Sequence, residues 1–283
     1  MDRISIMRKL TTDVLLKDLK FPEGLRWHDD RLWFSDMEDR KVISVNIKGE
    51  IESTVEVPNR PSGLGWLPDG KLIVVSMEDR KLLQLEMGVM KEFADLSKLA
   101  AYHLNDMVVS NQGRVYVGNF GFDYINNQPF LPAVIIMVTS DGKGKIVAEN
   151  MSFPNGLVIT PDNKTLIIAE TLSARLTAFD IKDDGTLINQ RLWADLKSIP
   201  PDGICLDEEG AIWVAAPGQH GVLRVLEGGT ITNIVKVENE AYACMLGGPN
   251  LTTLFIATSK SHLIRDKGQI EYIEVNVPKA GFP

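Results

Sequence analysis

A short loop motif recurs six times along the chain, and an apolar strand, a turn rich in Pro, Asp and Gly, and a second apolar strand follow each copy. Successive copies lie 39 to 50 residues apart, a period close to the length of one four-stranded propeller blade. The equivalent loop position holds, in chain order, Glu23, Ser62, Asn105, Asn155, Asp202 and Ala243. The repeat therefore predicts an all-β fold, a six-bladed β-propeller of four-stranded antiparallel blades.

Nothing in the 283 residues marks a boundary between domains, since no Ser/Pro-rich or low-complexity stretch separates the repeats. The segments 37–41 and 77–81 share the sequence Met-Glu-Asp-Arg-Lys, which indicates internal duplication. We therefore expect residues 1–283 to form one β-propeller domain. Residues 93–102 have apolar residues at helical spacing, so a short helix is expected there, between the second and third repeats.

The charge of the chain limits its partners. A net charge of -8, with no cluster of Lys or Arg, gives little electrostatic support for binding nucleic acid or an anionic membrane. Charged residues interrupt the apolar ones throughout residues 1–20, which leaves no stretch for export or membrane spanning. We expect a cytoplasmic protein, and a monomer because the blade surfaces show no large apolar stripe. Cys205 and Cys244 are expected to be buried reduced thiols.

The polar residues at the repeated loop position offer oxygen ligands. Glu23, Asn155 and Asp202 would supply two carboxylates and an amide carbonyl near the propeller axis, and these hard oxygens suit Ca²⁺ or Mg²⁺. The four histidines do not pair locally and only two cysteines are present, so a zinc site of thiolates and imidazoles is not favoured. We expect one divalent cation, with Ca²⁺ as first choice and Mg²⁺, Mn²⁺ or Zn²⁺ as alternatives.

A turn-forming role is the alternative for two of these residues. Asn155 and Asp202 each precede Gly, and Asn and Asp before Gly are among the commonest turn residues. Glu23 is a poor turn former, yet it occupies the same repeat position, and Pro precedes all three residues. Because proline fixes its own backbone, it helps to hold the following loop in one shape. These two features favour the ligand interpretation.

The loop motifs resemble those of the senescence-marker-protein/regucalcin/gluconolactonase family of six-bladed propellers. The resemblance extends over roughly residues 15–260 and rests on Phe21-Pro22-Glu23-Gly24, Asn105-Asp106, Phe153-Pro154-Asn155-Gly156-Leu157 and Pro201-Asp202-Gly203. It implies that Glu23, Asn155 and Asp202 are side-chain ligands of one divalent cation. It also implies that Asn105 lies beside the cation, where it contacts substrate or completes the shell, and that Asp202 acts as base or nucleophile.

His103 departs from the family pattern. Sugar lactonases of the family commonly carry Arg two residues before the Asn-Asp pair, and this chain has His103 there. An imidazole can be neutral near pH 7 and can transfer a proton, which a guanidinium cannot do in practice. His103 is therefore a second candidate base, and its presence argues against gluconolactone as the substrate. The alternative, a loop histidine whose ring nitrogens bond the backbone, stays open beside it.

The longest expected loop follows the second strand of the third repeat, at residues 118–129. Long loops on a rigid scaffold often carry binding residues, whereas the alternative is a simple excursion at the blade edge. The aromatic residues of this loop, close to His103, suggest a flat and rather apolar ligand. The candidate substrate-binding residues are Asn105, Asn119, Phe120, Phe122 and Asp123.

Together these features predict a metal-dependent hydrolase that acts on a small-molecule lactone or a related cyclic ester. The cation would serve as Lewis acid, with Asp202 or His103 as the base. No Gly-x-Ser-x-Gly elbow is present, so a serine esterase is not supported. Two alternatives remain: a diisopropylfluorophosphatase-like phosphoester hydrolase, in which the aspartate attacks phosphorus, and a non-catalytic calcium-binding propeller.

Overall fold

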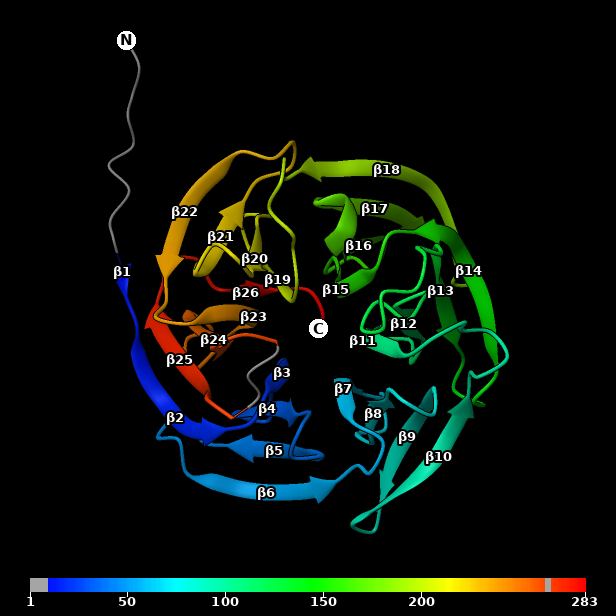
Figure 1. Cartoon of the computed structure of the whole chain (residues 1–283), viewed down its shortest axis with the longest axis horizontal. Helices are drawn as coiled ribbons and strands as arrows, with labels where there is room; N and C mark the ends of the chain where they lie inside the picture. The colour runs from blue at the N-terminus through cyan, green and yellow to red at the C-terminus, as the bar shows by residue number, and fades with distance from the viewer. Residues whose placement is uncertain (1–9, 263–265) are drawn as a thin grey trace.

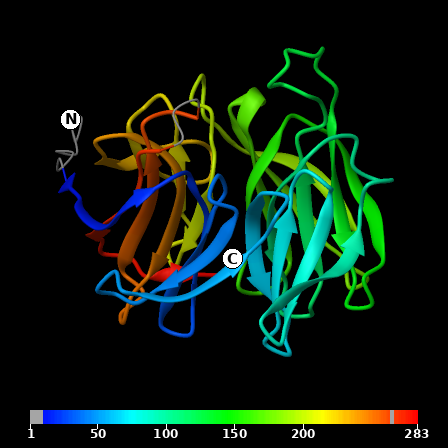
Figure 2. The ribbon, with the colours of Figure 1, turned by 60° about the horizontal axis from the view of Figure 1, so that its bottom comes forward.

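The computed structural model describes residues 10–262 and 266–283. In these ranges the strands form six small sheets arranged around a central axis, as Figure 1 shows. Figure 2, which turns the view by 60°, shows the sheets packed side by side around that axis. The prediction of an all-β six-bladed propeller is confirmed.

The first three blades follow the repeats in chain order. The first blade contains β3 (Pro22–His28), β4 (Arg31–Asp36), β5 (Lys41–Val45) and β6 (Ile51–Glu56). The second contains β7 (Pro61–Trp66), β8 (Leu72–Ser76), β9 (Lys81–Glu86) and β10 (Val89–Asp95). The third contains β11 (Leu104–Val109), β12 (Val115–Asn119), β13 (Ala133–Val138) and β14 (Gly144–Met151). In each blade every strand pairs antiparallel with the next one along the chain.

The last three blades continue the pattern, and the chain ends join them. The fourth blade contains β15 (Pro154–Ile159), β16 (Thr165–Glu170), the 3₁₀ turn η1 (Thr171–Ser173), β17 (Arg175–Ile181) and β18 (Leu187–Asp195). The fifth contains β19 (Ile204–Asp207), β20 (Ile212–Ala216), β21 (Gly221–Val225) and β22 (Ile231–Lys236). The sixth contains β23 (Glu240–Gly247), β24 (Thr253–Ser259) and β25 (Gly268–Glu274).

The N-terminal segment closes the ring of blades. β2 (Asp13–Leu19) pairs antiparallel with β25 and becomes the outer strand of the sixth blade. Two short strands enlarge the fifth sheet beyond the expected four strands: β1 (Leu10–Thr11) pairs parallel with β22, and β26 (Lys279–Ala280) pairs with β19. Since an unpaired strand edge is a site for unwanted pairing, these two short strands also cover both edges of the four-stranded fifth blade.

The burial of the strands explains why the apolar runs are so regular. Every residue of β8, β11 and β15 is buried, because inner strands lie between neighbouring blades and face them on both sides. The outer strand β6 instead alternates between exposed and partly buried residues. The inner strands therefore read as continuous apolar segments, and the outer strands read as alternating ones.

The prediction of a short helix between residues 93 and 102 is wrong. Phe93 lies inside β10, which pairs with β9. After β10 a single turn follows, in which Ala100 N donates to Leu96 O at 2.9 Å. The apolar residues have helical spacing because Leu96 and Ala100 are buried in one core cluster and Leu99 packs against it, all within the turn that follows the strand. The first residues of the expected helix are instead part of β10 and pair with β9.

Both cysteines are free thiols buried in the core, as expected. Cys244 Sγ lies 3.4 Å from Trp213 O, to which it donates a weak hydrogen bond. Between residues 10 and 262 and from 266 onward, no helix has the length and apolar character needed to cross a membrane.

Candidate metal and substrate site

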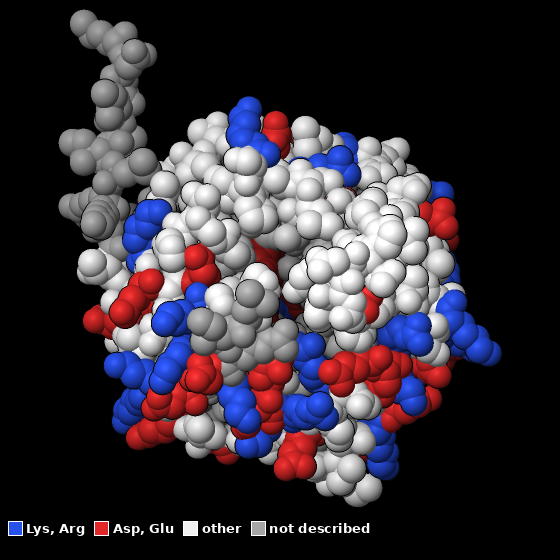
Figure 3. Space-filling view, in the orientation of Figure 1, with Lys and Arg blue, Asp and Glu red and all other residues white. Residues whose placement is uncertain are grey.

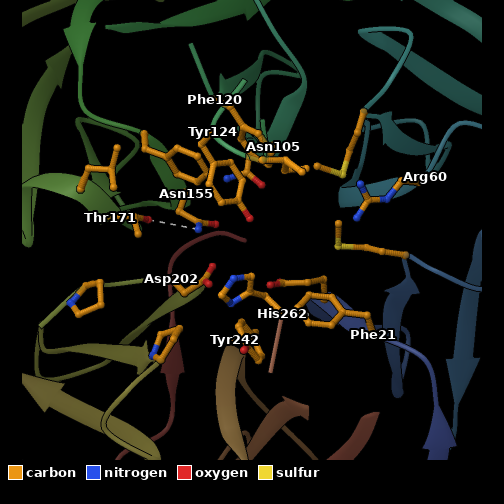
Figure 4. Close-up of a pocket in the computed structure, with 18 residues that line it drawn as sticks. Phe21, Arg60, Asn105, Phe120, Tyr124, Asn155, Thr171, Asp202, Tyr242 and His262 are labelled. Atoms are coloured by element: carbon orange, nitrogen blue, oxygen red, sulfur yellow. Dashed lines mark hydrogen bonds between the residues drawn. The ribbon is translucent and has the colours of Figure 1, made fainter. Parts of the chain in front are cut away.

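Four blades deliver a polar side chain to one cavity on the propeller axis. Glu23, Asn105 and Asn155 are the second residues of β3, β11 and β15, and Asp202 lies two residues before β19. In β3, β11 and β15 the pairing with the next strand shifts register at the polar residue: the shift begins at Glu23 and encloses Asn105 and Asn155. Such a bulge re-aims side chains. All four side chains line a cavity of 230 Å³, which Figure 4 shows and which we call the axial cavity.

The axial cavity opens at the centre of one propeller face. Figure 3 shows a hollow there, with acidic atoms visible inside it. The loops that join the second and third strands of the blades complete its rim, including Met37, Met77, Phe120 and Thr171. The structure thus brings Glu23, Asn105, Asn155 and Asp202 together, as the repeat indicates, whereas binding of a cation by these residues stays a prediction.

Hydrogen bonds orient the two amides with their oxygens available. Asn105 Nδ2 donates to Pro154 O at 3.1 Å, and Asn155 Nδ2 donates to Thr171 Oγ1 at 3.3 Å, the dashed line in Figure 4. The Thr171 hydroxyl in turn donates to Pro201 O at 2.8 Å, just before Asp202. Because both amide nitrogens are engaged, the amide oxygens are left to accept or to ligate.

The ionised forms of the carboxylates at the axial cavity are destabilised by burial. Burial raises the pKa of Glu23 to about 8, against the hydrogen bond from Gly24 N. Burial also raises the pKa of Asp202 well above its usual value, and the charges of Glu23 and Asp106 raise it further. Asp202 Oδ1 is buried and has no hydrogen-bond partner among the described residues. Such a pair needs protons or a cation to neutralise it.

A third acid lies behind this pair and has its own partner. Asp106 Oδ1 accepts from Arg26 Nη2 at 2.7 Å and from Met107 N at 2.8 Å. Burial still raises the pKa of Asp106, although Arg26 acts in the opposite direction. Since Arg26 compensates only one of three acids, the centre of the propeller carries excess negative charge when all three are ionised.

The donor set fits a hard divalent cation. Two carboxylates would balance its charge, and the oxygens of Asn105 and Asn155 can add neutral ligands of the kind that Ca²⁺ accepts. The structure, over the ranges it describes, contains no group of three or more His, Cys, Asp and Glu side chains placed to hold a metal. A cation here would therefore depend on the amide oxygens and on water or substrate, which disfavours Zn²⁺.

The walls of the axial cavity are apolar and aromatic. Phe120 stacks on Phe153 with ring centroids 4.4 Å apart, and Tyr124 meets the edge of Phe153 at 5.4 Å. On the other side, the rings of Phe21 and Tyr242 lie 4.8 Å apart. A ligand that fits this cavity would place a polar group at the carboxylates and amides and an apolar body between the rings.

Two of the predicted polar residues lie behind the walls. His103 stacks on Tyr102 at 4.1 Å and does not line the axial cavity. Burial lowers the pKa of His103, and the charge of Arg60 lowers it further, so the ring is neutral near pH 7. Asn119 Nδ2 donates to Val134 O at 2.8 Å, and its Oδ1 accepts from Gly121 N at 3.0 Å. The amide of Asn119 therefore serves to hold the backbone of the loop.

The other two predicted contacts also lie outside the cavity wall. Phe122 meets the edge of Phe130 at 5.5 Å. Asp123 Oδ2 accepts from Asn126 Nδ2 at 2.7 Å, within the loop itself. Of the loop residues proposed to contact substrate, Phe120 lines the axial cavity and Asn119, Phe122 and Asp123 do not. Substrate contacts by these three stay predictions without geometric support.

Sequence reasoning missed Arg60 and Thr171, which line the axial cavity. Arg60 precedes Pro61 as Phe21 precedes Pro22, so the repeat alignment contained a signal for it. Its Nη2 pairs with Glu38 Oε1 at 2.5 Å. Thr171 follows the second strand of its blade as Met37 follows β4 in the first, but this loop position was not compared between the repeats. Tyr124, Tyr242 and His262 also line the cavity.

The family comparison agrees with this architecture. Residues 21–260 match the SMP-30/Gluconolactonase/LRE-like region. The chain belongs to this family. Regucalcin from Xenopus laevis is 28% identical to this family member over 259 residues, which cover 87% of this chain and 79% of that protein. The resemblance inferred from the loop motifs is confirmed.

Two further relatives of this SMP-30/gluconolactonase family member are informative. Lactonase drp35 from Staphylococcus epidermidis is 27% identical over 221 residues, which cover 71% of this chain and 65% of that protein, slightly under two thirds of its length. The solved structure of a calcium-binding protein, regucalcin, from Agrobacterium tumefaciens has a TM-score of 0.78 and 20% identity, with 95% of this chain and 97% of that chain covered. At that identity the structural match shows the shared fold.

Proposed function

We propose that the axial cavity hydrolyses a lactone or a related cyclic ester with the help of one divalent cation, Ca²⁺ in the first place. One observation carries the proposal: Glu23 and Asp202, both with strongly raised pKa, line a single cavity with the oxygens of two amides. A site that concentrates unneutralised acids at the bottom of an apolar pocket is costly for stability and is typical of function. Glu23, Asn155 and Asp202 would hold the cation.

The residues around the cation have distinct parts in the proposed reaction. A bound divalent cation would supply Lewis acidity toward the ester carbonyl and would stabilise negative charge on its oxygen. Asp202, whose Oδ1 has no hydrogen-bond partner among described residues, takes the proton of the attacking water. Asn105, held by Pro154 O, orients the substrate. The position of His103 behind the wall favours Asp202 over His103 as the base.

The relatives support the same chemistry. One curated relative is named a lactonase and another is named regucalcin, and a solved structure of a regucalcin is described as a calcium-binding protein. The apolar rings around the axial cavity favour a lactone with an apolar body over a polyhydroxylated one. The substrate is thus proposed to be a small neutral molecule. We also propose that the protein acts as a monomer in the cytoplasm.

A metal-content assay coupled to a lactone-hydrolysis screen tests this proposal, with the wild type and Glu23→Gln compared. We expect the wild type to hold one ion and to hydrolyse at least one lactone, and the variant to lose at least about tenfold in ion affinity and in rate, because it removes a charged ligand. The matched control is Glu208→Gln, since Glu208 is exposed and lies on the turn after β19. A Glu23→Gln variant that keeps both ion and rate would overturn the ligand assignment.

The same experiment separates the alternatives. An ion without turnover of any lactone or phosphoester supports a non-catalytic calcium-binding propeller. Turnover of phosphoesters, with isotopic oxygen from water appearing in Asp202, supports an aspartate that attacks phosphorus. Isotopic oxygen found only in the product carboxylate supports the lactonase.

A further inference from the structure

A second cavity lies at the opposite end of the propeller axis. Its volume is 420 Å³, within the range of small-molecule sites. Residues at the ends of three inner strands line it: Trp27 is the next-to-last residue of β3, and Trp66 and Val109 are the last residues of β7 and β11. The segment that contains Lys279 and Phe282 closes its remaining side. We call it the lower cavity.

The segment from Lys279 to Phe282 is held firmly by backbone hydrogen bonds. Lys279 N donates to Leu251 O at 2.9 Å, β26 pairs with β19, and Phe282 exchanges two hydrogen bonds with Ile159 at 2.7 and 2.9 Å. The wall that this segment supplies is therefore a built part of the fold. The side chain of Lys279 is presented to the lower cavity by a fixed backbone.

One cation that lacks an acidic side-chain partner among the described residues lines the lower cavity. Arg26 and Lys279 line it, and its described lining residues include no Asp or Glu. Arg26 is only 4% exposed, and its Nη2 is paired with Asp106 Oδ1 at 2.7 Å, so its charge is compensated, while its Nε is buried without a hydrogen-bond partner in the described ranges. Lys279 Nζ donates to Gly281 O at 3.0 Å, and no described carboxylate, that of Pro283 included, lies within 4.0 Å of it. Lys279 is thus a partly buried cation without a described acidic side-chain partner, and an anion bound beside it would compensate its charge.

The pKa of Lys279 agrees with this geometry. Burial lowers it first, and the nearby charge of Arg26 adds to the effect, although Cys205 acts in the opposite direction. His28, which also lines the cavity, has its pKa lowered by burial, so it adds no fixed charge near pH 7. A negative charge bound beside Lys279 would act against this lowering of its pKa.

The opposite wall is aromatic. The ring of His28 stacks on Trp66 with centroids 3.9 Å apart, and Trp27 stacks on Phe255 at 5.5 Å. Flat apolar surfaces of this kind hold a flat apolar body, while Ser110 and Asn111 add polar groups at the rim. A bare inorganic ion would leave the aromatic surface unused.

We propose that the lower cavity is a binding site for a small organic carboxylate, with the carboxylate paired with Lys279 beside Arg26 and a flat apolar body against Trp27 and Trp66. The site is separate from the axial cavity, because it lies at the far ends of the inner strands. It does not depend on the proposed hydrolysis.

Calorimetric titration of the full chain with benzoate, benzamide and inorganic phosphate tests this site. We expect benzoate to bind with one-to-one stoichiometry and to quench tryptophan fluorescence, because two of the five tryptophans of the chain line the cavity. Benzamide, which has the same shape without the charge, should bind at least about tenfold more weakly, as a lost charge-assisted hydrogen bond implies. Phosphate should also bind more weakly than benzoate. Equal binding of phosphate would mean that only an adventitious ion is attracted, and would overturn the proposal.

Three variants locate the site. Lys279→Met keeps the side-chain length and the backbone hydrogen bond, and should weaken benzoate binding at least about tenfold, whereas Lys279→Arg should retain it. Lys197→Met is the matched control, because Lys197 is 85% exposed and lies on the loop that leads to Asp202, at the other end of the propeller. Glu23→Gln should leave benzoate binding unchanged. Benzoate binding that is lost in Glu23→Gln, or retained in Lys279→Met, would place the ligand elsewhere and refute the site.

Discussion

Gly156 N donates a hydrogen bond to Asp202 O at 3.2 Å, which joins the inner strand of the fourth blade to the loop that begins the fifth. A Cβ on Gly156 would lie 2.5 Å from Ile204 N and 2.8 Å from Asp202 O. Gly24 and Gly63 stand in the same relation to the next blade, since a Cβ there would meet Ser62 O at 2.6 Å and Met107 N at 2.5 Å. The glycine after the repeated polar position therefore permits the close approach of neighbouring inner strands that brings the polar residues together.

Gly156→Ala is expected to lower the free energy of unfolding by about 1–3 kcal/mol, because the added methyl group overpacks a backbone contact. It should also weaken cation binding by moving Asn155 away from Asp202. Chemical unfolding and calorimetric titration with Ca²⁺ measure the two effects. Gly70→Ala is the control: Gly70 has φ +82 and open space around its Cβ position, so it should lose about 1–2 kcal/mol through backbone strain alone and keep its ion affinity.

Asp202→Asn keeps the shape of the side chain and removes its charge. Because the proposed reaction requires Asp202 to accept a proton, kcat should fall by roughly 10²–10⁴. His103→Gln should change kcat less than tenfold, since His103 does not line the axial cavity. Steady-state kinetics on any hydrolysed lactone compares the two. A larger loss in His103→Gln than in Asp202→Asn would reverse the assignment of the base.

Thr171→Val tests the link between Asn155 and the fifth blade. The valine can neither accept from Asn155 Nδ2 nor donate to Pro201 O, so we expect a loss of about 1–3 kcal/mol in stability and a weaker ion site. Thr171→Ser retains the hydroxyl and should restore ion affinity. If both variants bind the ion equally, the hydroxyl has no positioning role.

The stability of the ion-free protein should fall as the pH rises from about 4.5 to about 8. Burial raises the pKa of Glu23 from 4.5 to about 8, so in this window the folded protein holds a proton that the unfolded chain has released. The unfolded state then binds fewer protons, and the free energy of unfolding decreases with pH. Thermal unfolding after treatment with a chelator measures the slope, which Glu23→Gln should reduce. An unchanged slope in that variant would contradict the prediction.

Arg26→Met should cost about 3–5 kcal/mol, because it leaves Asp106 buried at 7% exposure without its ion-pair partner. The double variant Arg26→Met with Asp106→Asn removes the uncompensated charge and should recover part of that loss. Urea unfolding of the two proteins compares them. A double variant less stable than Arg26→Met would show that the charge of Asp106 is not the source of the cost.

Much of the fold could be read from the sequence, because its signals are local. A blade is made of neighbouring segments joined by short turns, so the apolar runs and the turn residues of each repeat report directly on its strands. The same repeat placed Glu23, Asn105, Asn155 and Asp202 at equivalent points, and equivalent points of a closed ring face one axis. The apolar spacing around Leu96 misled the helix prediction, since strand pairing to β9 is a contact that the local pattern does not show.

The six-fold repeat, its strands and the equivalence of its polar loop residues were thus determined by the sequence alone. Tertiary structure decided which side chains face the axis, because that depends on bulges, on stacking and on neighbouring blades. His103 stacks on Tyr102 outside the axial cavity, and Asn119 donates to the backbone at Val134 O. Arg60 and Thr171 line the axial cavity instead. The lower cavity too exists only because the segment around Lys279 returns to β19 across a long separation in the chain.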